Sequence, residues 1–576
     1  MRIPIVSILI WLPVLGAFAA LCMPSCRSKT VKQLCVSIWL LQGICIAWIC
    51  QSYGHSIDPQ VGEGLSHHVM FLEQLPWINL SLGKSGTLSM QYLLGIDGMN
   101  LGCLGLAWVI IGIATVASCR ITQAVKAYAL LLLSLNAIIM GCLVTLDLLL
   151  FCFLFELALL PLYGFIAFWG ESRYPQAATI FFLYTFLGAL CMLVVTIAIG
   201  LSAYDPIATG IQAGLWGVAT APLPTAEVYA LVQTGIREQQ IPLECIVHTF
   251  DMTLLRHPQC FLPGSLLETG TAHLLLGHPA RLLAFLVFVC GLLIKLAAFP
   301  FHSWLPVAHV AAPTPISIIL AGIVLKLGGY ALFRIYSILP EAAMHYGWWI
   351  GGIGVTSMLY AGCNALAVRD FKQLVAYSSM AHMGFFLVGM SSRTVDGMQG
   401  ALYQMLSHGL IVSLLFLLVD MLASRTQDRS IDHYGGLASV VPRYTVFTAL
   451  AFAAAMGIPG FSGFMAEVLI LLGVFRAATL ELLPLWMGIV CSLGMLLNAA
   501  YYVQVIYRMF LGKLALPPAY MATTGRLPDL RKHEIAFLAL VLLLVIYLGI
   551  CPSFFLRTSQ GAIGHLVEVM RAHVSA

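Results

Sequence analysis

The feature that most constrains this sequence is the recurrence of apolar runs about 20 residues long over nearly its whole length. A bilayer core about 30 Å thick takes about 20 helical residues, and a spanning helix satisfies its own backbone polar groups. Only 9% of the 576 residues are charged, whereas soluble domains carry about 25%. The sequence therefore predicts an all-α polytopic membrane protein.

Fourteen runs are predicted to be transmembrane helices. They cover residues 3–24, 33–50, 98–118, 124–144, 146–169, 177–202, 281–305, 315–339, 342–366, 372–391, 397–424, 444–475, 484–511 and 533–556. Sixteen of the 28 Lys and Arg residues lie in loops that follow odd-numbered spans. Because basic residues that flank a span resist translocation, these loops are expected to face the cytoplasm or matrix, with both termini outside.

Two segments differ from simple spans. Residues 51–97 alternate apolar and polar side chains and contain Gly and Pro, which predicts a short hairpin on the outer face. Residues 203–280 form a long extramembrane stretch. Because so long a loop without secondary structure would be unusual, we expect helical packing within it.

Motifs for redox chemistry and nucleotide hydrolysis are missing from the sequence. We find no P-loop, no GxGxxG after a strand, no haem CxxCH and no iron–sulfur cysteine pattern. The 16 cysteines lie mostly singly within the apolar runs, as expected for buried thiols. Any electron transfer or ATP hydrolysis is therefore expected in another chain.

Four ionisable residues fall deep inside predicted spans: Glu156, Lys295, Lys326 and Glu467. Each costs about 2.5–3.5 kcal/mol at a helix centre on translocon scales, and such residues usually face a polar interior. Lysine can also snorkel to the interface, and a buried glutamate can simply be neutral. It would be a coincidence for all four buried residues to be snorkelling lysines or inert neutral glutamates. We therefore interpret the four residues as a functional site.

Helix-breaking residues accompany two of these charges. Pro300 follows Lys295, and a group of glycines and a proline precedes Glu467 in "GIPGFSGFMAE". Helices 7 and 12 are therefore predicted to be discontinuous, because exposed backbone at membrane depth needs a polar lining. Simple kinks are the alternative. Breaks five spans apart are expected if helices 4–8 and 9–13 form two inverted five-helix repeats.

These repeats define the predicted organisation of the chain. Helices 1–3 and the hairpin occupy 1–120, the first repeat occupies 121–202 and 281–339, and the insertion occupies 203–280. The second repeat occupies 340–511, and helix 14 with a tail occupies 512–576.

Histidines extend the polar positions along the predicted spans. His302 and His309 lie beside the first break, and His382 and His408 lie in spans ten and eleven. An ordinary pKa near 6.5 suits imidazole for proton relay, although a membrane histidine is equally often a structural hydrogen-bonding residue.

Several stretches resemble the antiporter-like membrane subunits of respiratory complex I. They are "LFCFLFELALLPLYGFIAFWG", "KLAAFPFHSWLPVAHVAAPTP", "LAGIVLKLGGYALFR", "RDFKQLVAYSSMAHMGF", "QMLSHGL" and "GIPGFSGFMAE". Within that family the chain is most similar to the M-type subunits, the counterparts of mitochondrial NADH dehydrogenase subunit 4. The glutamate at position 467 and the short C-terminal tail favour this type over the L- and N-type subunits.

The resemblance implies a proton-translocating subunit of NADH:quinone oxidoreductase. Glu156 and Lys295 would interact as a pair, Lys326 would be the central relay, and Glu467 would carry protons toward the outlet. It implies no redox cofactor in this chain; FMN, iron–sulfur clusters and quinone would belong to partner subunits. Further partners would be the neighbouring L- and N-type subunits and lipids, with no nucleic acid.

Two other functions remain open from the sequence: a Mrp-type Na⁺/H⁺ antiporter subunit, and a membrane scaffold that does not transport. A bacterial inner membrane is the preferred location, because no targeting segment precedes the first span; a mitochondrial inner or a thylakoid membrane is the alternative. The chain also departs from the family pattern, since Val307 and Ile180 stand where the family often has Asp and Lys.

Overall fold

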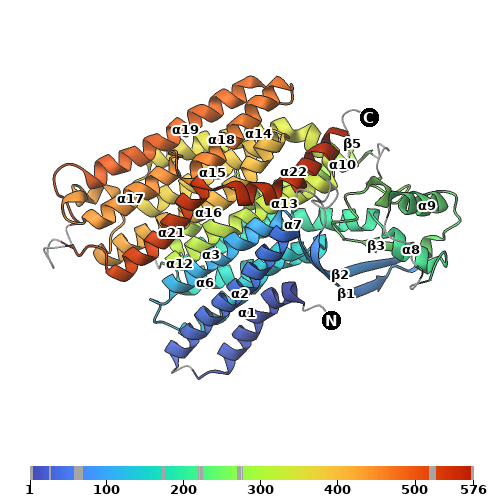
Figure 1. The fold of residues 1–576 in the computed structure, drawn as a ribbon, viewed down its shortest axis with the longest axis horizontal. Helices are drawn as coiled ribbons and strands as arrows, with labels where there is room; N and C mark the ends of the chain where they lie inside the picture. Colours follow the sequence, from blue (N-terminus) through green and yellow to red (C-terminus); the bar gives the residue numbers. More distant parts are fainter. Residues whose placement is uncertain are drawn as a thin grey trace.

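The structure is a computed structural model that describes residues 4–24, 27–56, 69–171, 175–217, 220, 225–268, 274–275, 277–517, 520 and 527–572. Within these residues, 13 helices are long and apolar enough to cross a membrane. They run roughly side by side along the molecule (Figure 1). The predicted all-α polytopic fold is therefore confirmed.

The single-segment spanning helices have these bounds: α1 (Ile5–Cys22), α2 (Ser28–Ser56), α3 (Asn100–Ser118), α4 (Val125–Val144), α7 (Ala177–Ser202), α14 (Pro340–Ala367), α15 (Phe371–Ser391), α16 (Val395–Thr426), α18 (Ser462–Thr479) and α21 (Lys532–Ile550). Other spans are composite: α5 (Leu148–Leu157) with α6 (Leu159–Trp169), α12 (Thr314–Ile319) and the π-helical turn η5 (Leu320–Val324) with α13 (Leu325–Ile338), and α19 (Leu485–Val505) with η8 (Ile506–Phe510).

Helices 7 and 12 are both broken, as predicted. Predicted helix 7 consists of α10 (Ala280–Lys295) and α11 (Trp304–Ala311), each too short to span by itself. Predicted helix 12 consists of α17 (Pro442–Ala455) and α18, which are separated by six residues at 456–461. Counting α10 with α11 as one path accounts for the fourteenth predicted span.

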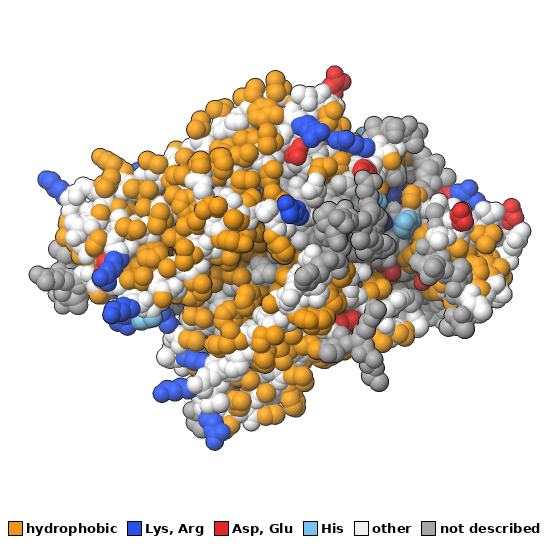
Figure 2. Space-filling model, in the orientation of Figure 1, with side chains coloured by type: hydrophobic (Ala, Val, Ile, Leu, Met, Phe, Trp, Pro, Cys, Tyr) orange, Lys and Arg blue, Asp and Glu red, His pale blue; other side chains and the backbone are white. Residues whose placement is uncertain are grey.

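The middle of the bundle is formed by α12–α13, α15 and α16. In the most apolar 18-residue stretch of each helix, 100% of the residues are buried for α12–α13, 94% for α15 and 89% for α16. By contrast, only 28% of the residues in the corresponding stretches of α1 and α21 are buried. The face of the bundle seen in Figure 2 is mostly hydrophobic. The charged residues of α13, Lys326 and Arg334, are 0% and 1% exposed and lie inside the bundle.

One end of the bundle, here called the outer end, carries a small extramembrane unit (Figure 1). The predicted hairpin is present as antiparallel strands β1 (Met70–Ser81) and β2 (Thr87–Ile96). Strand β3 (Val247–Thr249), from the 203–280 segment, adds in parallel beside β2. The same segment contains α8 (Pro206–Gln212), α9 (Ala226–Arg237) and the short pair β4 (Leu274–Leu275) and β5 (His278–Pro279).

The structure differs from the sequence prediction at several spans. Predicted helix 14 ends at Ile550, and the expected tail is another helix, α22 (Ser553–Ala572), which buries one apolar face against α16. The predicted continuous span 315–339 contains the π-helical turn η5. These irregularities depend on backbone hydrogen bonding, which hydropathy does not report. The division of the chain into repeats remains a prediction.

Candidate functional site

The first pair of buried charges joins α5 to α10. Lys295 Nζ lies 2.8 Å from Glu156 Oε1 and 4.5 Å from the centre of the Phe155 ring. Lys295 is the last residue of α10, where the negative end of the helix dipole favours a cation. The second oxygen of Glu156, Oε2, has no hydrogen-bond partner, so this carboxyl group retains a free acceptor.

The break after Lys295 is held open by side chains that satisfy its backbone. Trp304 Nε1 donates to the carbonyl oxygen of Ile294 in the last turn of α10, at 2.9 Å. The amide of Phe299 donates to Ser357 Oγ on α14, also at 2.9 Å. Backbone groups at membrane depth need hydrogen-bond partners within the protein. These two side-chain hydrogen bonds therefore lower the energetic cost of interrupting the helix.

Lys326 is fully buried one residue into α13, directly after the π-helical turn η5. Its Nζ donates to the carbonyl oxygen of Ala321 at 2.5 Å and lies 2.6 Å from His408 Nδ1. A π-helical turn disturbs the regular pairing of backbone carbonyls, which leaves this oxygen available. Within the described residues, Lys326 forms no ion pair, so its ammonium is solvated by a carbonyl and an imidazole.

A row of ionisable side chains continues from Lys326 across α16, α15 and α18. The rings of His408 and His382 have centroids 5.0 Å apart. His382 Nδ1 lies 3.0 Å from Gln404 Nε2 and 4.0 Å from Glu467 Oε1. Glu467 is fully buried, and neither carboxyl oxygen has a hydrogen-bond partner. We call Lys326, His408, His382 and Glu467 the central file.

Glu467 lies in the second turn of α18, beside the second helix break. Asn498 Nδ2 of α19 donates to the carbonyl of Ala455, the last residue of α17, at 2.8 Å. Gly457 adopts a positive φ of 71°, and a Cβ atom there would lie 2.2 Å from Glu467 Oε2. Sequence reasoning missed Asn498; its signal was an amide side chain in a mainly apolar span.

The structure therefore divides the seven predicted site residues into three places. Glu156 and Lys295 form one group, and the four residues of the central file form another. Lys295 packs near Gly328 of α13, but no polar contact between described residues links it to Lys326. His302 lies apart, with its ring centroid 4.6 Å from that of Tyr360 and 5.8 Å from that of Phe299.

A polar cavity of about 330 Å³ lies at the inner end of the bundle, opposite the hairpin. Charged side chains from α15, α16 and the loops line it: Arg120, Glu171, Lys372, Asp420 and Arg429. Lys372 is 3% exposed, and its Nζ donates to the carbonyl of Ala312 at 2.5 Å. Nothing in the sequence distinguishes Lys372 from the other basic residues that flank the spans.

His309 lies between this cavity and the central file. It is fully buried, stacks on Phe416, and neither ring nitrogen has a hydrogen-bond partner. It interacts electrostatically with both Lys372 and Lys326. Of the two histidines beside the first break, His309 is therefore the one directed toward the file.

The described residues contain neither a cluster of metal-ligating side chains nor a disulfide bond. No group of three or more His, Cys, Asp or Glu side chains in that part of the chain is arranged to hold a metal ion. The 15 described cysteines are free. The described site brings together Glu, Lys and His side chains, which can exchange protons.

Comparison with solved structures defines the class of this fold. A chain of "Respiratory complex I from Thermus thermophilus with bound NADH" matches with a TM-score of 0.73 and 23% identity, covering 98% of this chain and 99% of that chain. A chain of the Mrp complex from Dietzia sp. matches with a TM-score of 0.72 and 17% identity, covering 99% of this chain and 100% of that chain. The family model for "NADH:quinone oxidoreductase/Mrp antiporter, TM" matches residues 265–492. The chain has the fold of the antiporter-like polytopic membrane subunits.

Full-length relatives narrow this class. The NADH-quinone oxidoreductase subunit M of Rickettsia bellii is 30% identical over 573 residues, covering 98% of this chain and 99% of the relative. This chain belongs to the NADH-quinone oxidoreductase subunit M family. The chloroplastic NAD(P)H-quinone oxidoreductase chain 4 of Lolium perenne is 29% identical over 572 residues, covering 98% of each chain.

Proposed function

We propose that this chain is a proton-translocating membrane subunit of NADH:quinone oxidoreductase. The observation that carries the proposal is the central file, in which Lys326, His408, His382 and Glu467 follow one another from α13 to α18. All four side chains are 5% exposed or less. Ionisable groups inside a membrane bundle are costly to bury, and they usually mark an ion or proton pathway.

The cavity at the inner end supports an inlet to this file. A proton arriving at the cavity would pass by way of Lys372 and His309 to Lys326, because His309 has two free ring nitrogens and interacts with both lysines. From Lys326 it would move to His408, His382 and Glu467. Glu467 lies beside the α17–α18 break, so its carboxyl group is the proposed carrier toward the outlet.

The ion pair between Glu156 and Lys295 supports an electrostatic switch. Two unit charges 4 Å apart at an effective dielectric constant of 20 interact by about 4 kcal/mol. Moving one charge across 100 mV requires about 2.3 kcal/mol. Opening or closing this pair is therefore of sufficient scale to drive one proton step, provided that its motion is powered from outside the chain.

Electron transfer in partner subunits is the proposed source of that power. In this assembly FMN, iron–sulfur clusters and quinone would belong to other chains, and L- and N-type antiporter-like subunits would be neighbours in the membrane. The relatives named above include bacterial and chloroplastic proteins. We propose a bacterial inner membrane as the location of this chain.

The decisive experiment is proton uptake by proteoliposomes that contain the whole complex, energised with NADH and quinone. We expect Glu467→Gln to reduce the proton-to-electron ratio measurably and Lys326→Ala to reduce it as much, because each interrupts the file. Glu341→Gln is the matched control, since Glu341 pairs with Arg281 away from the file. A wild-type ratio in the Glu467→Gln and Lys326→Ala complexes would disprove the relay.

A second candidate function is a Mrp-type Na⁺/H⁺ antiporter subunit. The specific observation in its favour is the TM-score of 0.72 with a chain of the Mrp complex. Dependence on Na⁺ distinguishes the two candidate functions. A Mrp-type subunit would drive Na⁺-dependent proton exchange in vesicles without NADH. The proposed complex would instead require NADH oxidation and would pump equally with K⁺ as the only alkali cation.

A further inference from the structure

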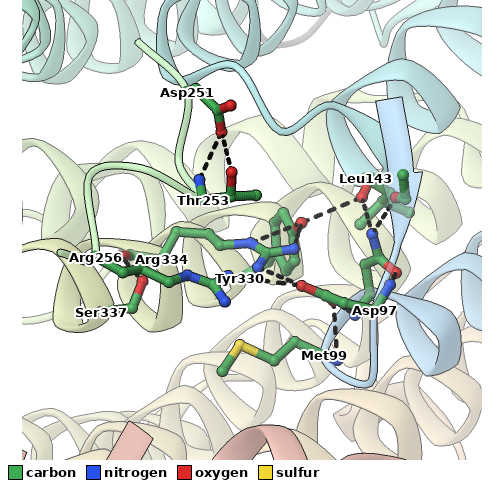
Figure 3. A network of polar contacts seen from close by, with 11 residues as sticks. Asp97, Met99, Leu143, Asp251, Thr253, Arg256, Tyr330, Arg334 and Ser337 are labelled. Carbon is green, nitrogen blue, oxygen red and sulfur yellow. Dashed lines mark hydrogen bonds and ion pairs between the residues drawn. The ribbon is translucent and has the colours of Figure 1, made fainter. Parts of the chain in front are cut away.

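A charged cluster outside the central file occupies the outer end of α13 (Figure 3). Asp97 lies between β2 and α3 and is 6% exposed. Its Oδ1 accepts hydrogen bonds from the amides of Met99 and Asn100, both at 3.0 Å. Its Oδ2 accepts from Arg334 Nη1 at 2.5 Å and lies 3.8 Å from Arg256 Nη2. Two guanidinium groups therefore share one carboxylate.

Arg334 connects this cluster to the buried lysine of the file. Its Nε and Nη2 donate to the hydroxyl of Tyr330, which donates in turn to the carbonyl of Leu143 at 3.2 Å. Lys326, Tyr330 and Arg334 are spaced four residues apart on α13 and therefore share one face of the helix. A polar column extends from the middle of the membrane to the outer end.

Arg256 comes from the extramembrane 203–280 segment, not from the membrane bundle. Its side chain is 22% exposed, and its Nε and Nη2 have no hydrogen-bond partner among the residues that the structure describes. The other charged group facing it is Asp251, whose carboxylate accepts from the amide and hydroxyl of Thr253, both at 2.7 Å. In Figure 3 the Asp251 carboxylate points toward Thr253, to which both dashed hydrogen bonds run.

The electrostatics of this arrangement are unfavourable for Arg256 itself. Burial and repulsion by Arg334 lower the pKa of the Arg256 guanidinium. Burial opposes ionisation of Asp97, but Arg334 and Arg256 hold the pKa of this carboxyl below its usual range. Asp97 is thus ionised at neutral pH. The pair formed by Asp97 and Arg334 has no net charge. Arg256 adds one positive charge, and its Nε and Nη2 form no hydrogen bond with a described residue that would offset the cost of burial.

We propose that Arg256 is a positioning residue that makes the outer end of α13 electropositive and so prevents protons from returning to Lys326 from the outer face. This inference rests on the proposed function. Without Arg256, the polar groups between the outer surface and Lys326 would be the Asp97–Arg334 ion pair, which has no net charge, and the Tyr330 hydroxyl. Lys326 and Arg334 are eight residues apart, about 12 Å along the helix. Arg256 gives the cluster of Asp97, Arg334 and Arg256 a net positive charge. Placed at the position of Arg334, this net charge at an effective dielectric constant of about 20 changes proton occupancy about tenfold.

The test is passive proton leak in proteoliposomes that contain the whole complex, with no NADH and with acid applied at the outer face. We expect Arg256→Gln to increase the leak about tenfold and Arg256→Lys, which keeps the charge, to leak like the wild type. Arg237→Gln is the matched control, because Arg237 belongs to the same segment and pairs with Glu268 at an exposed position.

Chemical rescue separates charge from packing. We expect Arg256→Cys to leak like Arg256→Gln, and attachment of a cationic aminoethyl group to that thiol to restore the wild-type leak. A neutral methylthio group of similar reactivity should not restore it. A wild-type leak in Arg256→Gln, or equal leak with cationic and neutral groups, would overturn the proposal. Because no NADH is present, the result is independent of whether Glu467 and Lys326 pump.

Discussion

At the scale of single residues, the ammonium groups of Lys295 and Lys326 are stabilised in different ways. Lys295 has a carboxylate partner, Glu156, whereas Lys326 has a carbonyl oxygen and the imidazole of His408. Burial removes the hydration of both ammonium groups, but only Lys295 gains the attraction of a carboxylate. The charged form of Lys326 is therefore less stable than that of Lys295. Lys326 is therefore suited to release a proton, and Lys295 to retain one until Glu156 moves.

Glu467 depends on the absence of a side chain at Gly457. A Cβ atom at this glycine would lie 2.2 Å from Glu467 Oε2. We therefore expect Gly457→Ala to displace the carboxylate from His382 and to reduce NADH-driven proton uptake tenfold or more. The measurement is the initial rate of proton uptake by proteoliposomes containing the variant complex.

Gly460→Ala controls for backbone strain in this prediction. Gly460 has a φ of 99°, in the left-handed region like that of Gly457, but nothing lies within 4 Å of its would-be Cβ. Both alanines carry a conformational penalty of about 1–2 kcal/mol. Equal loss of proton uptake in the two variants would attribute the effect to strain and not to the carboxylate.

At the scale of helices, the polar site is built from interruptions. Lys295 follows the end of regular pairing in α10, Lys326 follows a π-helical turn, and Glu467 follows the gap between α17 and α18. Each interruption exposes backbone groups that a regular helix would hide. Bringing charged side chains to such places reduces their burial cost, because free carbonyls and amides provide polar neighbours.

The α10 break gives a prediction at this scale. Trp304→Phe keeps an aromatic ring in place but removes the donor to the Ile294 carbonyl. An unsatisfied buried carbonyl costs about 1–3 kcal/mol, so we expect a lower thermal unfolding midpoint. We also expect weaker proton uptake, since the last turn of α10 carries Lys295.

Trp39→Phe is the matched control, because Trp39 Nε1 donates to the carbonyl of Trp108 at 2.9 Å, far from either break. It should lower the unfolding midpoint by a similar amount while leaving the proton-to-electron ratio unchanged. If the two variants pump equally well, the geometry of the α10 break does not control Lys295.

At the scale of the whole molecule, the outer unit and the membrane bundle share an electrostatic joint. Asp97 begins α3, Arg334 belongs to α13, and Arg256 belongs to the 203–280 segment. Strand β3 of that segment also pairs with β2 of the hairpin. Parts of the chain that are distant in sequence are therefore held together by one buried carboxylate and one sheet.

Removal of this carboxylate should destabilise the whole protein. Losing one partner of a buried ion pair costs about 3–5 kcal/mol, so we expect Asp97→Asn to lower the thermal unfolding midpoint. Because Arg334 and Arg256 hold the pKa of Asp97 below its usual value, despite burial, its stabilising effect is present at pH above about 4 and is lost as pH falls through the lower folded pKa.

The measurement is thermal unfolding of the detergent-solubilised complex at pH 8, 5 and 3.5. The difference between wild type and Asp97→Asn should be the same at pH 8 and 5 and should begin to shrink at 3.5. The double variant Asp97→Asn/Arg256→Gln should recover part of the loss, since it removes one unpaired guanidinium. A difference that disappears by pH 5 would contradict the low pKa.

The sequence predicted most of the architecture because its physical signals are local. Apolar run length indicated the spans, and proline and glycine beside charged residues indicated the breaks in helices 7 and 12. The alternation of residues in 51–97 indicated the hairpin. The same local signals could not separate α21 from α22 at Cys551–Pro552 or locate the π-helical turn before Lys326, because both depend on neighbouring helices.

By itself, the sequence determined that this chain lies in a membrane and carries Glu156, Lys295, Lys326 and Glu467 at membrane depth. Only the tertiary structure decided how they are grouped: it joined Lys326 to Glu467 through two histidines, left His302 apart, and brought Arg256 to Asp97 from 159 residues away. Hydropathy is a property of each segment. The energy of a buried charge depends instead on which atoms other segments place within a few ångströms of it.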